Sequence, residues 1–117
     1  MLRSLLYKGF TSLLLASAVA FGQSQNASLE GQVTDKSGAV IPHAKATITS
    51  AERQFSTSIE TDADGRFAFP NLVPGLYDVT ISATGFRTYV QHQLQLLANQ
   101  AARIDASLDV GDATTQI

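Results

Sequence analysis

The feature that most constrains this chain is a stretch in its second half, residues 64–86, where apolar side chains recur at every second position. Phe67 and Phe69 form one such run, and residues 77–83 form another. A two-residue period places side chains on one face of a pleated strand. The segment 70–75 between the runs holds two prolines and a glycine, a composition that favours a turn. The stretch therefore predicts two antiparallel strands joined by a turn, with Leu72 covering one end of a core.

The same period begins at Ala27 and continues through most of the chain, and no helical period occurs beyond the N-terminal segment. It predicts seven strands, at 27–34, 44–51, 54–61, 66–69, 76–83, 88–97 and 101–110. Short strands separated by turn residues are typical of two packed sheets, so we predict an all-β fold, a seven-stranded antiparallel β-sandwich. The predicted core consists of Leu29, Val33, Ile48, Ile59, Phe67, Phe69, Leu72, Tyr77, Val79, Ile81, Phe86, Ile104 and Leu108, and the predicted turns contain Gly65, Pro74, Gly75 and Gly85.

The first 20 residues have the pattern of a secretory signal peptide, with Arg3 and Lys8 followed by an apolar run from residue 10 to residue 21. Small side chains at Ala18 and Ala20 predict cleavage after Ala20, with cleavage after Gly22 as an alternative. An uncleaved anchor is a further alternative, but the run is interrupted and shorter than the roughly 20 apolar residues of a membrane span. We expect a short tether at 21–26, one β-domain at 27–111 and a polar tail or linker at 112–117.

Composition narrows the function classes. The chain of 117 residues has no cysteine, which excludes thiolate nucleophiles, thiolate metal sites and a lipid-modified cysteine. Its formal net charge is −2, and removal of the leader would make it about −4. The remaining Lys and Arg residues are scattered singly among acidic residues, whereas a nucleic-acid-binding protein clusters them. We therefore expect an exported protein, periplasmic, outer-membrane associated or secreted, with no nucleic-acid partner and no membrane span in its mature chain.

Five segments carry a resemblance to a known family. They are residues 31–35 (GQVTD), 38–44 (GAVIPHA), 61–69 (TDADGRFAF), 72–79 (LVPGLYDV) and 83–86 (ATGF). With these, the chain resembles the carboxypeptidase regulatory-like domain family. The resemblance implies a transthyretin-like (prealbumin-like) sandwich of the carbohydrate-binding-like and Cna B-like group, acting as a non-catalytic accessory module. The ending Leu108-Asp-Val-Gly111 is similar to the junction at which Oar-like TonB-dependent receptors continue into a plug and barrel. The chain is then a free-standing exported module or the N-terminal piece of a longer receptor.

Two features are candidates for metal binding. Asp62 and Asp64, followed by a glycine, look like the start of a calcium loop, but the later ligand positions fall in the largely apolar segment 67–73. His43 and His92 are the only histidines, and a catalytic zinc site normally has three protein ligands. A Gly-x-Ser-x-Gly motif and a His-x-x-Glu pair are both absent from the sequence. We therefore favour a turn at residues 62–65 and expect no metal, no cofactor and no enzymatic activity.

Two functions remain from these considerations. The favoured one is a non-catalytic interaction module of the cell envelope, which binds an unidentified protein partner through loops and a sheet edge. The alternative is a carbohydrate-binding domain, since sugar sites present aromatic rings to solvent and Tyr89 lies outside the predicted core. Phe55 is a weaker candidate for the same role, and the chain has no tryptophan. The sequence leaves the oligomeric state open.

Overall fold

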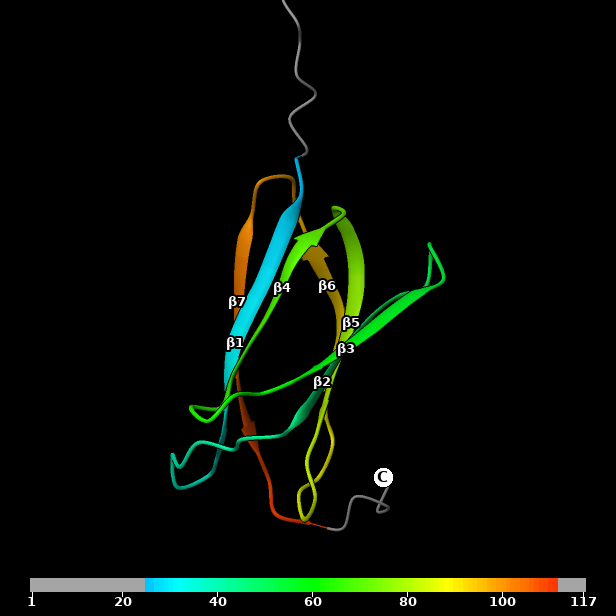
Figure 1. Cartoon of the computed structure of the whole chain (residues 1–117). Helices are drawn as coiled ribbons and strands as arrows, with labels where there is room; N and C mark the ends of the chain where they lie inside the picture. The colour runs from blue at the N-terminus through cyan, green and yellow to red at the C-terminus, as the bar shows by residue number, and fades with distance from the viewer. Residues whose placement is uncertain (1–24, 112–117) are drawn as a thin grey trace, which may run out of the picture.

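The computed structural model describes residues 25–111 and shows a sandwich of two β-sheets (Figure 1). The seven strands of this part are β1 (Ala27–Asp35), β2 (Lys45–Ser50), β3 (Phe55–Glu60), β4 (Arg66–Leu72), β5 (Gly75–Ser82), β6 (Tyr89–Leu96) and β7 (Ala101–Leu108). One sheet has the order β4-β1-β7 and the other the order β3-β2-β5-β6. The predicted seven-stranded β-sandwich is confirmed. The predicted leader, its cleavage site and the tail at 112–117 lie outside the described residues, and residues 25–111 contain no helix of the length and hydropathy that a membrane crossing requires.

One strand pair corrects the prediction that all neighbours are antiparallel. β1 and β7 run in parallel, with Ser28 opposite Ala101 and Asp35 opposite Leu108. Parallel neighbours need a long connection, and here the five strands β2–β6 all lie between them in the chain. β7 follows β6, which belongs to the other sheet, so the chain crosses the sandwich to reach β1. Apolar residues alternate identically in both orientations, and the sequence pattern therefore did not reveal the parallel pair.

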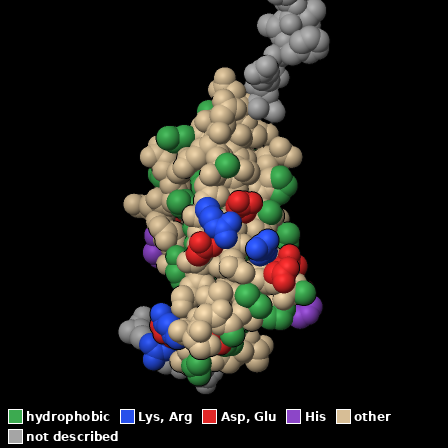
Figure 2. All heavy atoms as spheres, turned by 90° about the vertical axis from the view of Figure 1, so that its left-hand side faces the viewer, with side chains coloured by type: hydrophobic (Ala, Val, Ile, Leu, Met, Phe, Trp, Pro, Cys, Tyr) green, Lys and Arg blue, Asp and Glu red, His purple; other side chains and the backbone are tan. Residues whose placement is uncertain are grey.

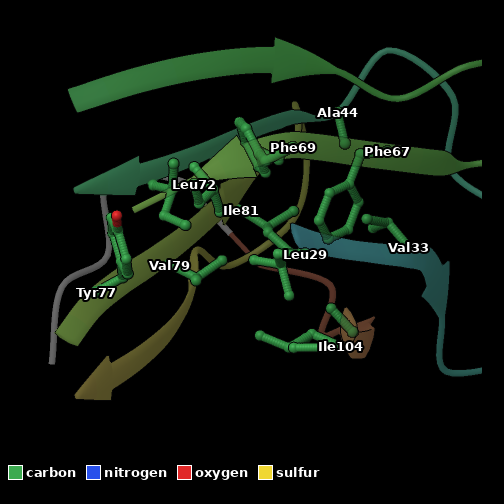
Figure 3. Packing of buried hydrophobic residues seen from close by; sticks show 14 of the residues in the cluster. Leu29, Val33, Ala44, Phe67, Phe69, Leu72, Tyr77, Val79, Ile81 and Ile104 are labelled. Carbon is green, nitrogen blue, oxygen red and sulfur yellow. The ribbon is translucent and has the colours of Figure 1, made fainter. Parts of the chain in front are cut away.

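The core lies between the facing sheets, and Figure 3 shows side chains from both of them meeting there. Leu29 and Val33 on β1 and Val79 and Ile81 on β5 have no exposed surface. The buried hydrophobic residues are Ala27, Leu29, Val33, Ile41, Ala44, Ala46, Ile48, Phe67, Phe69, Leu72, Tyr77, Val79, Ile81, Leu96, Ala102, Ile104, Ala106 and Leu108. Eleven of the thirteen predicted core residues are among them, and Phe86 is partly buried and packs against the cluster.

The thirteenth, Ile59, was wrongly predicted to lie in the core. It lies opposite Ala46 on β2, so its side chain is on the inner side of the four-stranded sheet as expected. However, β3 is the outermost strand of that sheet, and the β2–β3 hairpin extends away from the three-stranded sheet (Figure 1). The three-stranded sheet covers it only in part, and Ile59 is 39% exposed. Phe55, on the same side of β3, is 42% exposed for the same reason.

Gly31, at the middle of β1, allows the two neighbouring strands of the same sheet to approach closely. It lies opposite Phe67 on β4 and opposite Ile104 on β7. A Cβ atom at this position would lie 1.8 Å from the carbonyl oxygen of Ile104 and 2.8 Å from the ring of Phe67. Both distances are far inside van der Waals contact, so only glycine fits between these neighbours.

A bulge in β6 explains why the alternation of apolar residues changes phase there. Tyr77 lies opposite Leu94, but Val79 lies opposite Gln91, so β6 has one extra residue between these pairs. Gln93 takes up the extra residue with a φ of 55°. The carboxylate of Asp78 accepts a hydrogen bond from the backbone N–H of Gln93 at 3.0 Å and thereby holds the bulge.

The Asp78 contact makes part of the stability dependent on pH. The N–H of Gln93 and, secondarily, the nearby ring of His92 hold the pKa of Asp78 below its ordinary value of 3.8, against the opposing effect of burial. A lowered folded-state pKa gives stability above the unfolded value, and this contribution disappears as the pH falls through the folded pKa. In urea denaturation, the midpoints of wild type and Asp78→Asn should therefore differ fully at neutral pH and converge as the pH falls below the ordinary carboxyl value of 3.8. A difference that stays constant over this range would contradict the assignment.

Candidate functional site

Tyr89, the predicted ligand-binding residue, begins β6 and lies opposite Ile81, on the inner side of the four-stranded sheet. Its ring is partly buried and packs against the core cluster. Its hydroxyl donates a hydrogen bond to the side chain of Gln91 at 3.2 Å. The structure therefore places Tyr89 at the rim of the core, with only part of its ring available to a ligand. A binding role for Tyr89 stays a prediction.

The Asp62–Gly65 segment forms a tight turn between β3 and β4. The N–H of Gly65 donates to the carbonyl of Asp62 at 2.9 Å. One carboxylate oxygen of Asp62 accepts the N–H groups of Asp64 and Arg66, both at 2.9 Å, so it is already occupied by the turn. Gly65 has a φ of 73°, which favours glycine. Of the other predicted turn residues, Pro74 separates β4 from β5, Gly75 is the first residue of β5, and Gly85 follows β5 with a φ of 86°.

The two histidines lie beside different carboxylates. His43 Nδ1 is 3.7 Å from Glu60, and His92 Nδ1 is 3.6 Å from Asp78; the two histidines and Glu60 are largely exposed, and Asp78 is about half exposed. Within residues 25–111 there is no group of three or more His, Cys, Asp or Glu residues that could hold a metal ion.

A broad polar hollow of about 540 Å³ lies at the three-stranded sheet and reaches β3. Across that sheet, Glu30 on β1 is directly opposite Ala68 on β4 and Arg103 on β7, so these three outward residues form one row. Ala68 provides a small side chain beside two long ones. Arg66, two positions before Ala68 at the start of β4, flanks the row. The hollow is lined by Glu30, Gly31, Ile59, Glu60, Asp62, Arg66, Phe67, Ala68 and Arg103.

Arg103 lies between two carboxylates on this face. Arg103 binds Asp105 with two contacts, Nη2 to Oδ1 at 3.0 Å and Nε to Oδ2 at 3.2 Å, and approaches Glu30 at 3.6 Å. The side chains of all three are half or more exposed, and Figure 2 shows cationic and anionic side chains grouped on this face of the sandwich. Arg66 makes no ion pair within the described residues. Guanidinium and carboxylate groups held in this way offer hydrogen bonds of both polarities to a polar partner. This row could not be predicted from the sequence, because its alignment across three strands depends on their register.

A second, more apolar hollow of about 340 Å³ lies between the edges of β3 and β4. Phe55 and Ile59 line it from β3, and Phe69 and Leu72 line it from β4. β3 and β4 belong to different sheets and have no backbone pairing with each other, so the sandwich is open along this side.

The two-sheet sandwich assigns this chain to the class of small β-sandwich modules. Its surface is shallow and polar, and residues 25–111 contain no cluster of metal ligands. Within that class, the chain belongs to the carboxypeptidase regulatory-like domain family, whose model matches residues 28–109. It is also 28% identical over 102 residues to the TonB-dependent transporter Oar of Myxococcus xanthus. That match covers 84% of this chain and 10% of the transporter, so the chain spans about a tenth of that relative's length.

Solved structures share the fold at low identity. The TIE protein of Bacillus anthracis matches with a TM-score of 0.61 and 17% identity, over 71% of this chain and 16% of that one. A protein of Bacteroides uniformis, provisionally described as carbohydrate binding, matches with a TM-score of 0.59 and 12% identity, over 71% and 41% of the two chains. Hydroxyquinol 1,2-dioxygenase of Pseudomonas putida has the same TM-score and identity, over 79% and 59%. Identities this low establish a common fold, which also occurs in an enzyme, and no common activity.

Proposed function

We propose that this chain is an exported, non-catalytic interaction module of the cell envelope, and that it serves as the N-terminal extension of a TonB-dependent receptor-like protein. The observation that carries the proposal is the polar hollow across β4, β1 and β7. The small side chain of Ala68 forms its floor, and Glu30 and Arg103 place charges of both signs at its rim. Such a surface suits a polar partner surface, because charged rims give specificity and orientation on contact. The family and the similarity to the Oar transporter support an envelope location.

The contact surface can be tested by site-specific photo-crosslinking in the native host. A photoreactive residue at Ala68 lies on the floor of the hollow, and one at Thr49 lies exposed on the outer side of the other sheet. We expect an envelope product larger than two copies of the chain from position 68 and none from position 49. Arg103→Glu should abolish that product. Equal products from both positions would contradict a role for the hollow.

Export is tested separately by mass spectrometry of the purified chain. A mature N-terminus at Phe21 or Gln23 is expected from the leader pattern. Recovery of the intact chain, starting at Met1, from the cytoplasm would overturn the envelope assignment.

Carbohydrate binding is the second candidate, and the hollow also supports it, since carboxylates and guanidinium groups bind sugar hydroxyls. Affinity electrophoresis through polysaccharide gels separates the two functions. Retardation that is lost in both Arg103→Ala and Tyr89→Ala would favour sugar binding at Tyr89, and loss in Arg103→Ala alone would move the site to the hollow. Unretarded migration in every polysaccharide would remove this candidate.

A further inference from the structure

The sandwich has four free strand edges, at β3 and β6 in one sheet and at β4 and β7 in the other. An unpaired edge is a template for another strand, and proteins block it with proline, bulges or charges. β4 contains Pro70, followed by Asn71 with a φ of 59°. β6 contains its bulge at Gln93. β7 carries the paired charges of Arg103 and Asp105.

β3 has none of these devices along its middle. Its sequence, Phe55 to Glu60, contains no proline, lysine or arginine, and its one charge is at the last residue. None of its residues has a positive φ. It also carries Phe55 and Ile59, two of the large hydrophobic side chains that remain about 40% exposed. β3 is therefore the one edge of the described sandwich that is left ready for pairing.

The hydrogen-bonding phase of β3 shows which backbone groups are free. Beyond the end of the strand, the N–H of Thr61 donates to the carbonyl of Ala44 at 2.8 Å, so Thr61 faces the β2 side. In an antiparallel ladder, residues alternate between facing the neighbour and facing away. Residues 55, 57 and 59 therefore bond to β2, and the N–H and C=O groups of Ser56, Ser58 and Glu60 point outward.

We propose that β3 pairs with β3 of a second copy of this chain, antiparallel and about a two-fold axis at Thr57. In this register Phe55 lies opposite the partner's Ile59, and Ile59 lies opposite the partner's Phe55. Ser56 exchanges backbone hydrogen bonds with the partner's Ser58, using only groups that point outward. A shift of one residue would place inner side chains against outer ones. A shift of two would place Phe55 opposite a threonine or beyond the strand, so only the proposed register pairs all four apolar side chains.

Charge complementarity also favours a second copy. The tip of the β2–β3 hairpin, residues 51–54, carries Glu52 and Arg53, and neither makes an ion pair within the described residues. In the proposed register this tip runs past the end of the partner's β3. Arg53 then falls opposite the partner's Thr61, between the partner's Glu60 and Asp62, and Glu60 itself lies opposite the partner's Gln54, which is uncharged. The two-fold axis creates this opposite-charge contact twice, and it also places Glu52 of the same tip near the partner's Asp62.

Single-cysteine crosslinking tests the register directly, because the natural chain has no cysteine. Thr57 would face its own copy in a non-hydrogen-bonded pair, where Cα atoms are about 4.5 Å apart, within disulfide reach. We expect Thr57→Cys to form disulfide-linked dimers at least tenfold faster than Thr47→Cys under the same oxidant. Thr47 is the matched control, since it lies one strand further in, on β2. Equal rates would overturn the proposal.

Sedimentation of the purified chain provides an independent measurement. A six-residue strand pair is at the small end of specific interfaces, so the wild-type mass should rise from one chain to two as the concentration increases. Ser58→Pro removes an outward N–H and should abolish the dimer, whereas Ser58→Thr should retain it. If the wild type sediments as a single chain at every concentration, the proposal is wrong. This holds even if the β3 edge then proves to bind a different peptide. If Ser58→Pro does not fold, the crosslinking rates still decide the question.

Discussion

Gly31→Ala is expected to be the most damaging single-methyl addition in the described chain. Its Cβ would lie 1.8 Å from the carbonyl oxygen of Ile104, and a backbone atom has no alternative rotamer to adopt. The substitution therefore has to displace β7 from β1 or rotate the backbone of β1 away from Phe67. Overpacking in a dense core costs about 1–3 kcal/mol and occasionally more. We expect at least about 3 kcal/mol here, a large part of the roughly 5–15 kcal/mol that a domain of this size has.

Chemical denaturation of the purified variant measures this loss, with Gly38→Ala as the control. Gly38, unlike Gly31, has a positive φ, of 92°, and no atom lies within 4 Å of its would-be Cβ. Gly38→Ala should therefore lower the free energy of unfolding only by the cost of a left-handed backbone conformation, on the order of 1–2 kcal/mol. A loss in Gly31→Ala no larger than the loss in Gly38→Ala would show that β1 and β7 accommodate the added methyl group without a large displacement.

The second large effect is expected at Ile81, whose side chain has no exposed surface and lies at the centre of the core (Figure 3). Ile81→Ala removes buried methyl groups and leaves a cavity between the sheets. Such truncations cost about 2–5 kcal/mol, and complete burial places Ile81 towards the upper half of that range.

Ile59→Ala is the matched comparison, because it makes the same chemical change on the same sheet. Ile59 is 39% exposed, so its truncation should cost less than about 1 kcal/mol. Denaturation should be measured at low concentration, where self-association through β3 does not contribute. If Ile59→Ala were as costly as Ile81→Ala, β3 would be covered in solution by part of the chain or by another molecule.

The comparison of these two isoleucines shows what the sequence predicts well. Alternation places side chains on one face of a strand, and both Ile59 and Ile81 lie on the inner face. Burial also requires an opposing layer, and the position of a strand within its sheet decides whether that layer exists. β5 is central and β3 is at the edge, a difference that depends on long-range pairing.

The polar hollow could not be predicted from the sequence either, because it too depends on long-range strand pairing. Glu30 and Arg103 are 73 positions apart in the chain and become neighbours only through the parallel β1–β7 pair. Ala68 joins their row through the antiparallel β1–β4 pair. Tyr89 was predicted to bind a ligand because it lies outside the predicted core. The bulge in β6 changes the phase of the strand, and Tyr89 faces the inner side of the sheet. Local alternation determines the strands, and register determines the surface.

The parallel pairing of β1 and β7 has a mechanical consequence. β1 begins and β7 ends at opposite ends of the sandwich, so a pull on the chain at residues 25 and 111 runs along both strands. The force would load the hydrogen bonds of all eight matched residue pairs together in shear, instead of opening them one at a time as in a hairpin. A module of this design would resist stretching along its long axis.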